Sequence, residues 1–421
     1  MIFEAKKNAI RKAYSLIEKM LTSKESKDDE FSVFTMIAEN GKVVFVGESE
    51  DFPIMTFVDK AKVIVEGRVT VSLSEITNTF KESYRKDVLL TIESQENVVK
   101  IDDGFYDPND IRVINEYEKD IFLISNKHLF SMDREVFFNS LYECAVAVKN
   151  TYLTGTSYLQ VNVSDEVEFY STSLHQIIRK TVSADIHSQS VFYIEKERLA
   201  RMVRLVKEDK SKEILCFIDE NEVHIVSSVM QFKVPIEKNI SFPRVKEVME
   251  SIVSKDVYGM CKKDVMTRMK EIDSYYKEKG IKDTKDTVLF LTLNEPFEIV
   301  PDVDKEMVTE SDGCDEENVE KVEHTELDSE TPSIMQLTEE KVNALISGNI
   351  GIFHSEELVF VRNCINTKYG LFKNIIKGIK EESLTIYNTD SIGCVKEPLI
   401  IEYKHEQNGH YQSLIMPLVK R

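Results

Sequence analysis

Lysine and arginine recur at helical spacings in several amphipathic segments of the chain. In the segment 368–380, Lys373, Lys377 and Lys380 are four and three residues apart, which places them along one face of a helix. Cationic side chains in this arrangement can contact the phosphates of a nucleic acid without reading its bases. Other helical segments carry comparable residues, namely Lys7, Arg11, Lys81, Arg85, Arg198 and Arg201. The basic residues of any one helix could simply be a solvated surface. Because they recur on several helices in a chain of net charge −20, they predict one basic surface built from equivalent helices.

The sequence shows no residue pattern typical of an enzyme or of a metal site. It has no phosphate-binding loop, no serine-hydrolase elbow and no HExxH motif, and its eight histidines are scattered. The six cysteines form no CxxC pair, so we expect reduced thiols, no metal and no cofactor. A nuclease or another hydrolase remains an alternative, because a catalytic pair could lie among the 74 acidic residues. No stretch approaches the ~20 apolar residues of a membrane helix and no secretory leader is present, so we expect a cytoplasmic protein.

The helical segments belong to an internal repeat. One set begins at Lys6, Arg134 and Asp256, and a second set begins at Leu73, Lys196 and Asn366, each member of the second set being followed by a strand-like run. The third repeat is longer than the others, and its excess falls in the acidic segment at about 301–332. That segment lacks periodicity and aromatic residues, a composition that predicts disorder.

Alternating apolar and polar runs between the helical segments predict strands, for example at 42–47, 157–163 and 398–404. Each repeat therefore reads as helix, strands, helix, strands. We expect an α+β protein of three consecutive modules, each with two helices packed on antiparallel sheets. The predicted domains are residues 1–117, 118–241 and 242–421.

Several segments resemble the bacterial-type DNA sliding clamps, the β subunits of the replicative DNA polymerase III. The C-terminal YQSLIMPLVKR is similar to the closing strand of that family, a Tyr-aliphatic-aliphatic-Met-Pro-aliphatic run. In EVEFYSTSLHQIIRKTV, Thr172, His175 and Ile177 match the family's Thr-Asp-Gly-His-Arg-Leu signature, while the other positions depart from it. SFPRVKEVM and NTKYGLFKNII resemble two further segments of the third domain, in the right order. The departures and the acidic insertion indicate a divergent member, with a phage origin as one option.

The resemblance implies a ring of two copies joined head to tail, with helices around duplex DNA and sheets outside. It also implies an apolar pocket that binds short peptides of a DNA polymerase and other partners. Carried over position by position, that pocket comprises Leu153, Thr172, Leu174, His175, Ile177, Pro243, Val248, Leu414, Met416, Pro417 and Leu418. We assign His175 no acid or base role.

The same resemblance places DNA-contacting loops at two positions after helices. These loops add Lys24, Lys27, Lys149, Asn150 and Tyr152 to the basic helix residues named above. The implied partners are a second copy of the chain, duplex DNA bound without sequence preference, a polymerase and a clamp loader. The expected location is the cytoplasm of a bacterium or of an infected host cell. The main rival is a peptide-binding protein of the same fold that does not encircle DNA.

Overall fold

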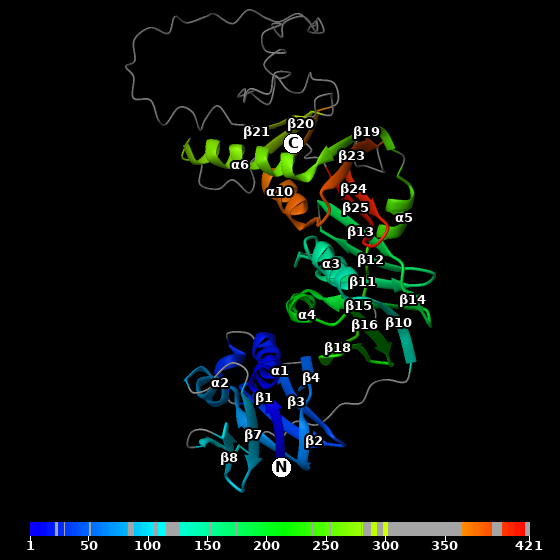
Figure 1. Ribbon diagram of the computed structural model, residues 1–421. Coiled ribbons are helices and arrows are strands. Elements are labelled where there is room, and N and C mark those ends of the chain that lie inside the picture. Colours follow the sequence, from blue (N-terminus) through cyan, green and yellow to red (C-terminus); the bar gives the residue numbers. More distant parts are fainter. Residues whose placement is uncertain are drawn as a thin grey trace, which may run out of the picture. The chain divides into compact units, whose positions relative to one another are not determined.

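The structure is a computed structural model whose chain forms two compact units (Figure 1). Unit 1 comprises Met1–Leu174, Ile178–Val245 and Lys404–Tyr411, and unit 2 comprises His175–Ile177, Lys246–Tyr403 and Gln412–Arg421. The structure describes residues 1–21, 24–28, 30–49, 52–82, 88–104, 108–114, 127–151, 153–173, 175–237, 240–252, 254–278, 280, 288–292, 298–301, 364–389 and 398–416. All but the first residue of the acidic segment predicted at 301–332 lies outside them.

Six strands lead directly into helices, so each of these six helices begins at the end of a strand. The pairs are β1 (Ile2–Lys6) and α1 (Lys7–Met20), β6 (Gly67–Ser72) and α2 (Leu73–Glu82), β10 (Lys127–Asp133) and α3 (Arg134–Ala145), β15 (Ser190–Glu195) and α4 (Lys196–Glu208), β19 (Ser254–Cys261) and α6 (Lys262–Glu278), and β22 (Cys364–Lys368) and α10 (Tyr369–Gly378). The predicted helix start at Asp256 was wrong, because residues up to Cys261 pair as a strand with β23 (Ser383–Thr389). The corrected starts at 7, 134 and 262 are 127 and 128 residues apart, a more regular repeat than the sequence indicated.

Strand pairing confirms the threefold internal repeat. The strand before the first helix of each repeat pairs antiparallel with the strand after the second helix, giving the pairs of β1 with β7 (Leu89–Ser94), β10 with β16 (Glu213–Ile218) and β19 with β23. The strand after the first helix pairs with the strand before the second, giving β2 (Val33–Glu39) with β6, β11 (Tyr158–Val163) with β15, and β20 (Val288–Thr292) with β22. Each repeat therefore consists of two sets of antiparallel strands, and one helix follows a strand of each set.

Unit 1 contains a nine-stranded sheet in the order β14-β10-β16-β17-β18-β4-β3-β2-β6. Its two halves come from different repeats and join where β18 (Met230–Pro235) pairs with β4 (Phe52–Phe57), with Phe232 opposite Ile54. A second sheet has the order β5-β1-β7-β8-β9 and ends at β9 (Asn109–Arg112). The remaining strands of this unit are β3 (Lys42–Ser49), β5 (Lys62–Val65), β8 (Val98–Asp102), β12 (Val167–Thr172), β14 (Asp185–Ile186) and β17 (Glu222–Val226).

Unit 2 contains β19, β23, β24 (Leu399–His405) and part of β25 (Gly409–Ile415), besides the sheet β21-β20-β22, whose edge strand is β21 (Glu298–Pro301). The end of β25 lies beside the start of β13 (Gln176–Val182). Met416 N donates to the His175 carbonyl oxygen at 3.0 Å, and Gln176 Nε2 donates to Ser413 Oγ at 3.2 Å. The short segments η1 (Glu25–Lys27), η2 (Thr154–Ser157) and α5 (Val245–Glu250) complete the described elements.

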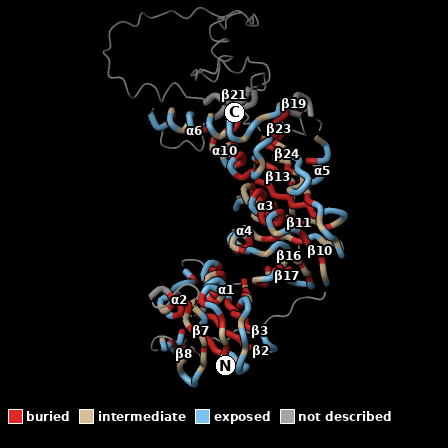
Figure 2. The backbone as a smooth tube through the Cα atoms, viewed as in Figure 1, coloured by how far each residue is buried: buried red, intermediate tan, exposed pale blue. Residues whose placement is uncertain are grey.

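The helices α1, α4, α6 and α10 bury one side and expose the other, whereas α3 is buried over most of its surface (Figure 2). On α1 the buried face includes Ile10 and Ile17, and a Cβ at Gly47 of β3 would clash with the Ile17 side chain. A glycine there lets the helix approach the sheet closely. At the start of α3, Asp133 caps the helix by accepting hydrogen bonds from the Glu135 and Val136 N–H groups at 2.7 and 3.1 Å. No helix in the described part of the chain has the length and apolarity needed to cross a membrane.

Candidate nucleic-acid interface and partner pocket

The helices of unit 1 pack beside one another in pairs. α1 packs against both α2 and α4, and α4 also packs against α3 (Figure 1). Lys19 at the end of α1 makes an ion pair of 2.7 Å with Glu208 at the end of α4. In unit 2, α6 packs against α10. The helices of each unit therefore lie next to one another.

Several of the predicted DNA-facing residues are exposed. These are Arg11, Lys24, Lys27, Lys149, Asn150 and Lys377. Lys7 is different, because its side chain is only 6% exposed and burial lowers its pKa. The sequence spacing placed Lys7 on the exposed face with Arg11, but it occupies the first position of α1, where the chain turns out of β1. The side chain of Lys81, and all of Arg85 and Tyr152, lie outside the described residues.

Three other predicted phosphate contacts already have carboxylate partners. Arg198 Nη1 lies 2.7 Å from Glu237 Oε1, and Arg201 Nη1 lies 3.3 Å from Glu25 Oε1. Lys373 Nζ lies 2.6 Å from Asp273 Oδ2. Each partner neutralises much of the charge that a phosphate would need. The exposed residues listed above are therefore the stronger candidates for DNA contact.

Asp273 of α6 holds α10 in place through this contact. Its carboxylate accepts hydrogen bonds from Lys373 Nζ and Tyr369 Oη, and Lys373 also donates to Tyr369 Oη at 2.9 Å. Burial pushes the pKa of Asp273 upward, but the hydrogen bonds from Lys373 and Tyr369 outweigh it and hold the pKa below its usual value. Burial and the nearby Asp273 both raise the pKa of Tyr369, which remains a neutral donor.

The folded state lowers the pKa of Asp273. The ionised carboxylate therefore stabilises the fold above its unfolded-state pKa of about 3.9. This stabilisation is lost as the pH falls through the folded-state pKa. We expect Asp273→Asn to lower the free energy of unfolding by about 0.2–1 kcal/mol at pH 7, the range of a partly exposed pair. Urea titrations of both proteins should show the difference narrowing as the pH falls toward ~3. A constant difference over that range would contradict the ionic origin.

The structure describes eight of the eleven predicted pocket residues and places them in two groups. In unit 1, Thr172 is buried, Leu153 is 45% exposed and Pro243 is half-buried. Gly155 lies so close to Pro243 and the Ser241 carbonyl oxygen that a Cβ would clash, which fixes the segment next to Leu153 against Pro243. Leu153 is therefore an exposed apolar side chain at a rigid position.

The second group lies in unit 2, where the hydrogen bond from Met416 to the His175 carbonyl brings the two strand ends together. His175 is exposed and Met416 half-buried. Ile177 and Leu414 are buried and Val248 is half-buried, so Ile177 and Leu414 belong to the core. Leu174, Pro417 and Leu418 lie outside the described residues.

One cluster of metal-ligating side chains occurs within the described residues, at the hairpin between β16 and β17. His224 Nε2 lies 3.1 Å from Asp219 Oδ2, and Glu222 Oε2 lies 3.1 Å from Lys233 Nζ. The Glu222 oxygen that pairs with Lys233 also lies 3.9 Å from His224 Nε2. Asp219 also accepts backbone hydrogen bonds from Asn221 and Glu222. The cluster is thus a hydrogen-bonded turn.

No protein-family model and no curated protein sequence matches the chain. Solved structures do match over its full length. The DNA polymerase sliding clamp of Bacillus subtilis superposes with a TM-score of 0.70 at 14% identity, and the DNA polymerase β subunit of Streptococcus pyogenes with 0.71 at 11%, each covering 100% of both chains. The sliding clamp of Pseudomonas aeruginosa bound to griselimycin gives 0.68 at 12% with the same coverage. The chain therefore has the fold of the bacterial DNA sliding clamps, the β subunits of DNA polymerase III, in a divergent form.

Proposed function

We propose that this protein is a DNA sliding clamp, a non-catalytic processivity factor that encircles duplex DNA and tethers a DNA polymerase. The proposal is carried by the way the repeats join. Two repeats meet where β18 of one pairs with β4 of the preceding one, and β25 runs beside β13 at the next boundary. At each joint, a strand that follows the second helix of one repeat lies beside a strand that follows the first helix of the preceding repeat. This relation continues from repeat to repeat.

The same relation is left unfulfilled at the two ends of the chain. β9, which follows α2, ends its sheet, and β21, which follows α6, ends another, so each has one strand neighbour among the described residues. An unpaired strand edge is a template for pairing with a second chain. In a second copy, the strands after α6 are the matching partner for β9. Repeating this pairing in both directions gives a closed head-to-tail dimer.

A closed ring explains how the protein could hold DNA despite its net charge of −20. A ring retains DNA topologically, so its phosphate contacts can be few and weak, which permits sliding. Arg11, Lys24, Lys27, Lys149 and Lys377 are the exposed cations that we assign to those contacts. Loading onto circular DNA then requires a clamp loader or spontaneous opening of one interface. We place this activity in the cytoplasm of a bacterium or of an infected cell.

The test combines light scattering at micromolar protein concentration with retention on nicked circular DNA. We expect the mass of a dimer and retention on the circle, followed by release when the circle is linearised, because only a linear duplex has ends from which a ring can slide. A monomer retained equally on both DNAs would refute encirclement. That result would favour the second candidate, a peptide-binding protein of the clamp fold, for which the exposed Leu153 is the supporting observation.

We further propose that polymerase peptides bind at the predicted pocket, to which Met416, half-buried, contributes an apolar side chain. Unbranched methionine adapts to different partner side chains. We expect deletion of Met416–Arg421 to abolish binding of the polymerase peptide while leaving the dimer mass unchanged. Fluorescence anisotropy with a labelled peptide measures the first property and light scattering the second. Retained peptide binding by the truncated dimer would refute the pocket assignment.

A further inference from the structure

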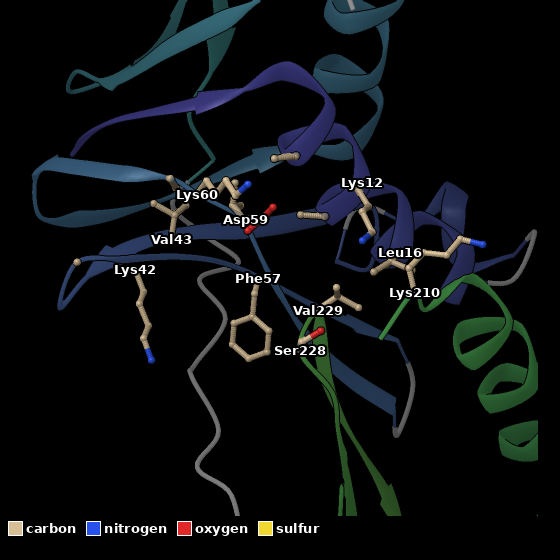
Figure 3. Close-up of a pocket in the computed structure, with 15 residues that line it drawn as sticks. Lys12, Leu16, Lys42, Val43, Phe57, Asp59, Lys60, Lys210, Ser228 and Val229 are labelled. Carbon is tan, nitrogen blue, oxygen red and sulfur yellow. The ribbon is translucent and has the colours of Figure 1, made fainter. Parts of the chain in front are cut away.

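A cavity lies in unit 1 beside the joint of β18 with β4. It has a volume of about 640 Å³, within the range of ligand-binding sites. Its walls come from α1, the starts of β3 and β18, the turn after β4 and the turn after α4. Figure 3 shows Lys12 and Leu16 of α1 on one side and Val229 opposite, with Lys210 beside them and Asp59 and Lys60 at the other end.

The cavity gathers positive charge in an acidic protein. Four lysines line it against a single carboxylate, that of Asp59, and all four are exposed: Lys12, Lys42, Lys60 and Lys210. Within the described part of the chain, no carboxylate forms an ion pair with any of them. Other cations on α1 and α4 differ, because Lys19 of α1 pairs with Glu208 and Arg201 of α4 pairs with Glu25. Unpaired ammonium groups around one cavity favour an anionic ligand.

The walls between the lysines are aliphatic. Ala13, Leu16 and Val43 are buried and contribute to the lining, while Val229 is half-buried at the opposite side. Phe57 also borders the cavity, but its ring points away from α1 (Figure 3), so no aromatic face lies opposite Lys12 for a base to stack on. A phosphodiester strand would leave the aliphatic walls unused. A ligand with carboxylates flanking an aliphatic side chain satisfies both the lysines and the walls.

We propose that this cavity is a docking site for an acidic peptide segment of a partner protein, with an aliphatic side chain seated between Leu16 and Val229 and carboxylates facing Lys12, Lys60 and Lys210. The site is independent of the peptide pocket at Met416 and of encirclement of DNA. It would give the protein a second class of partner, selected by negative charge.

The probe is a fluorescein-labelled Asp-Glu-Leu-Leu-Asp-Glu peptide, titrated with the full chain and followed by anisotropy at low salt. We expect saturable binding that Lys12→Gln with Lys210→Gln weakens about two- to thirtyfold, as two exposed charge pairs should. Lys207→Gln with Lys277→Gln changes the net charge equally at exposed positions outside the cavity and should leave the affinity within about twofold. Val229→Ser should weaken the same peptide about three- to tenfold, because the leucine loses an apolar contact.

Three outcomes would overturn the proposal. One is the absence of saturable binding. Another is an equal loss in the control variant, which would show a general charge effect. The third is tighter binding of an oligo-dT strand that depends on Lys12 and Lys210 but not on Val229, which would make the cavity a nucleic-acid site. Circular dichroism of each variant confirms that it is folded.

Discussion

We expect Lys180→Met to lower the free energy of unfolding by about 3–5 kcal/mol. This is the largest loss of stability that we expect from a single substitution. Lys180 of β13 and Glu143 of α3 are both 0% exposed, and Lys180 Nζ lies 3.0 Å from Glu143 Oε2. Removing the ammonium group leaves a fully buried carboxylate without its cationic partner. Burial of a charge that has lost this partner, more than the lost attraction, causes the loss.

The double variant Glu143→Met with Lys180→Met separates these causes. Both charges are gone, so we expect stability within about 1 kcal/mol of the original protein or above it. The matched exposed control is Lys62→Met, because Lys62 pairs with Glu4 at 3.2 Å while 71% exposed, and its loss should cost less than about 1 kcal/mol. Urea unfolding midpoints measure all three variants. Equal losses in the single and double variants would show that packing, not charge, dominates at this site.

Asp110→Pro in β9 is expected to convert the proposed head-to-tail dimer to a monomer and to reduce retention on circular DNA to the level on linear DNA. Arg112 N donates to Glu75 Oε2, away from β8, whereas Val113 N donates to the Asn97 carbonyl on the other side. N–H groups alternate along a strand, so that of Asp110 points to the same side as that of Arg112. Proline at position 110 therefore removes an outward donor without removing a hydrogen bond to β8.

Asp110→Ala is the control, because it removes the carboxylate and keeps the N–H group. It should remain a dimer and stay on the circle. The far-ultraviolet circular dichroism spectra of both variants should match that of the original protein, since the side chain of Asp110 is exposed. A dimeric Asp110→Pro variant would show that the interface lies elsewhere than β9, and the head-to-tail arrangement would have to be abandoned.

The local elements were predictable from the residues. The run KVVFVG became β3, and the helices from Lys196 and Leu73 begin where the pattern placed them, because burial of one face imposes a period of 3.6 or 2.0 on the apolar residues. The helix start expected at Asp256 was wrong because the apolar pattern there was too short to decide between a helix and a strand. Residues 256–261 are too few to show either period clearly, and pairing with β23 decided the matter.

The amino-acid sequence by itself determined the threefold repeat, the α+β class and the resemblance to sliding clamps, since all three depend on local periodicity and short motifs. Only the tertiary structure decided which of the predicted DNA-facing cations have a carboxylate partner. Glu25 is 176 residues from Arg201, and Asp273 is 100 residues from Lys373, so no local spacing announces those pairs. The same holds for Glu143 and Lys180, and for the four lysines around one cavity. Charge pairing acts through space, and the fold alone sets those distances.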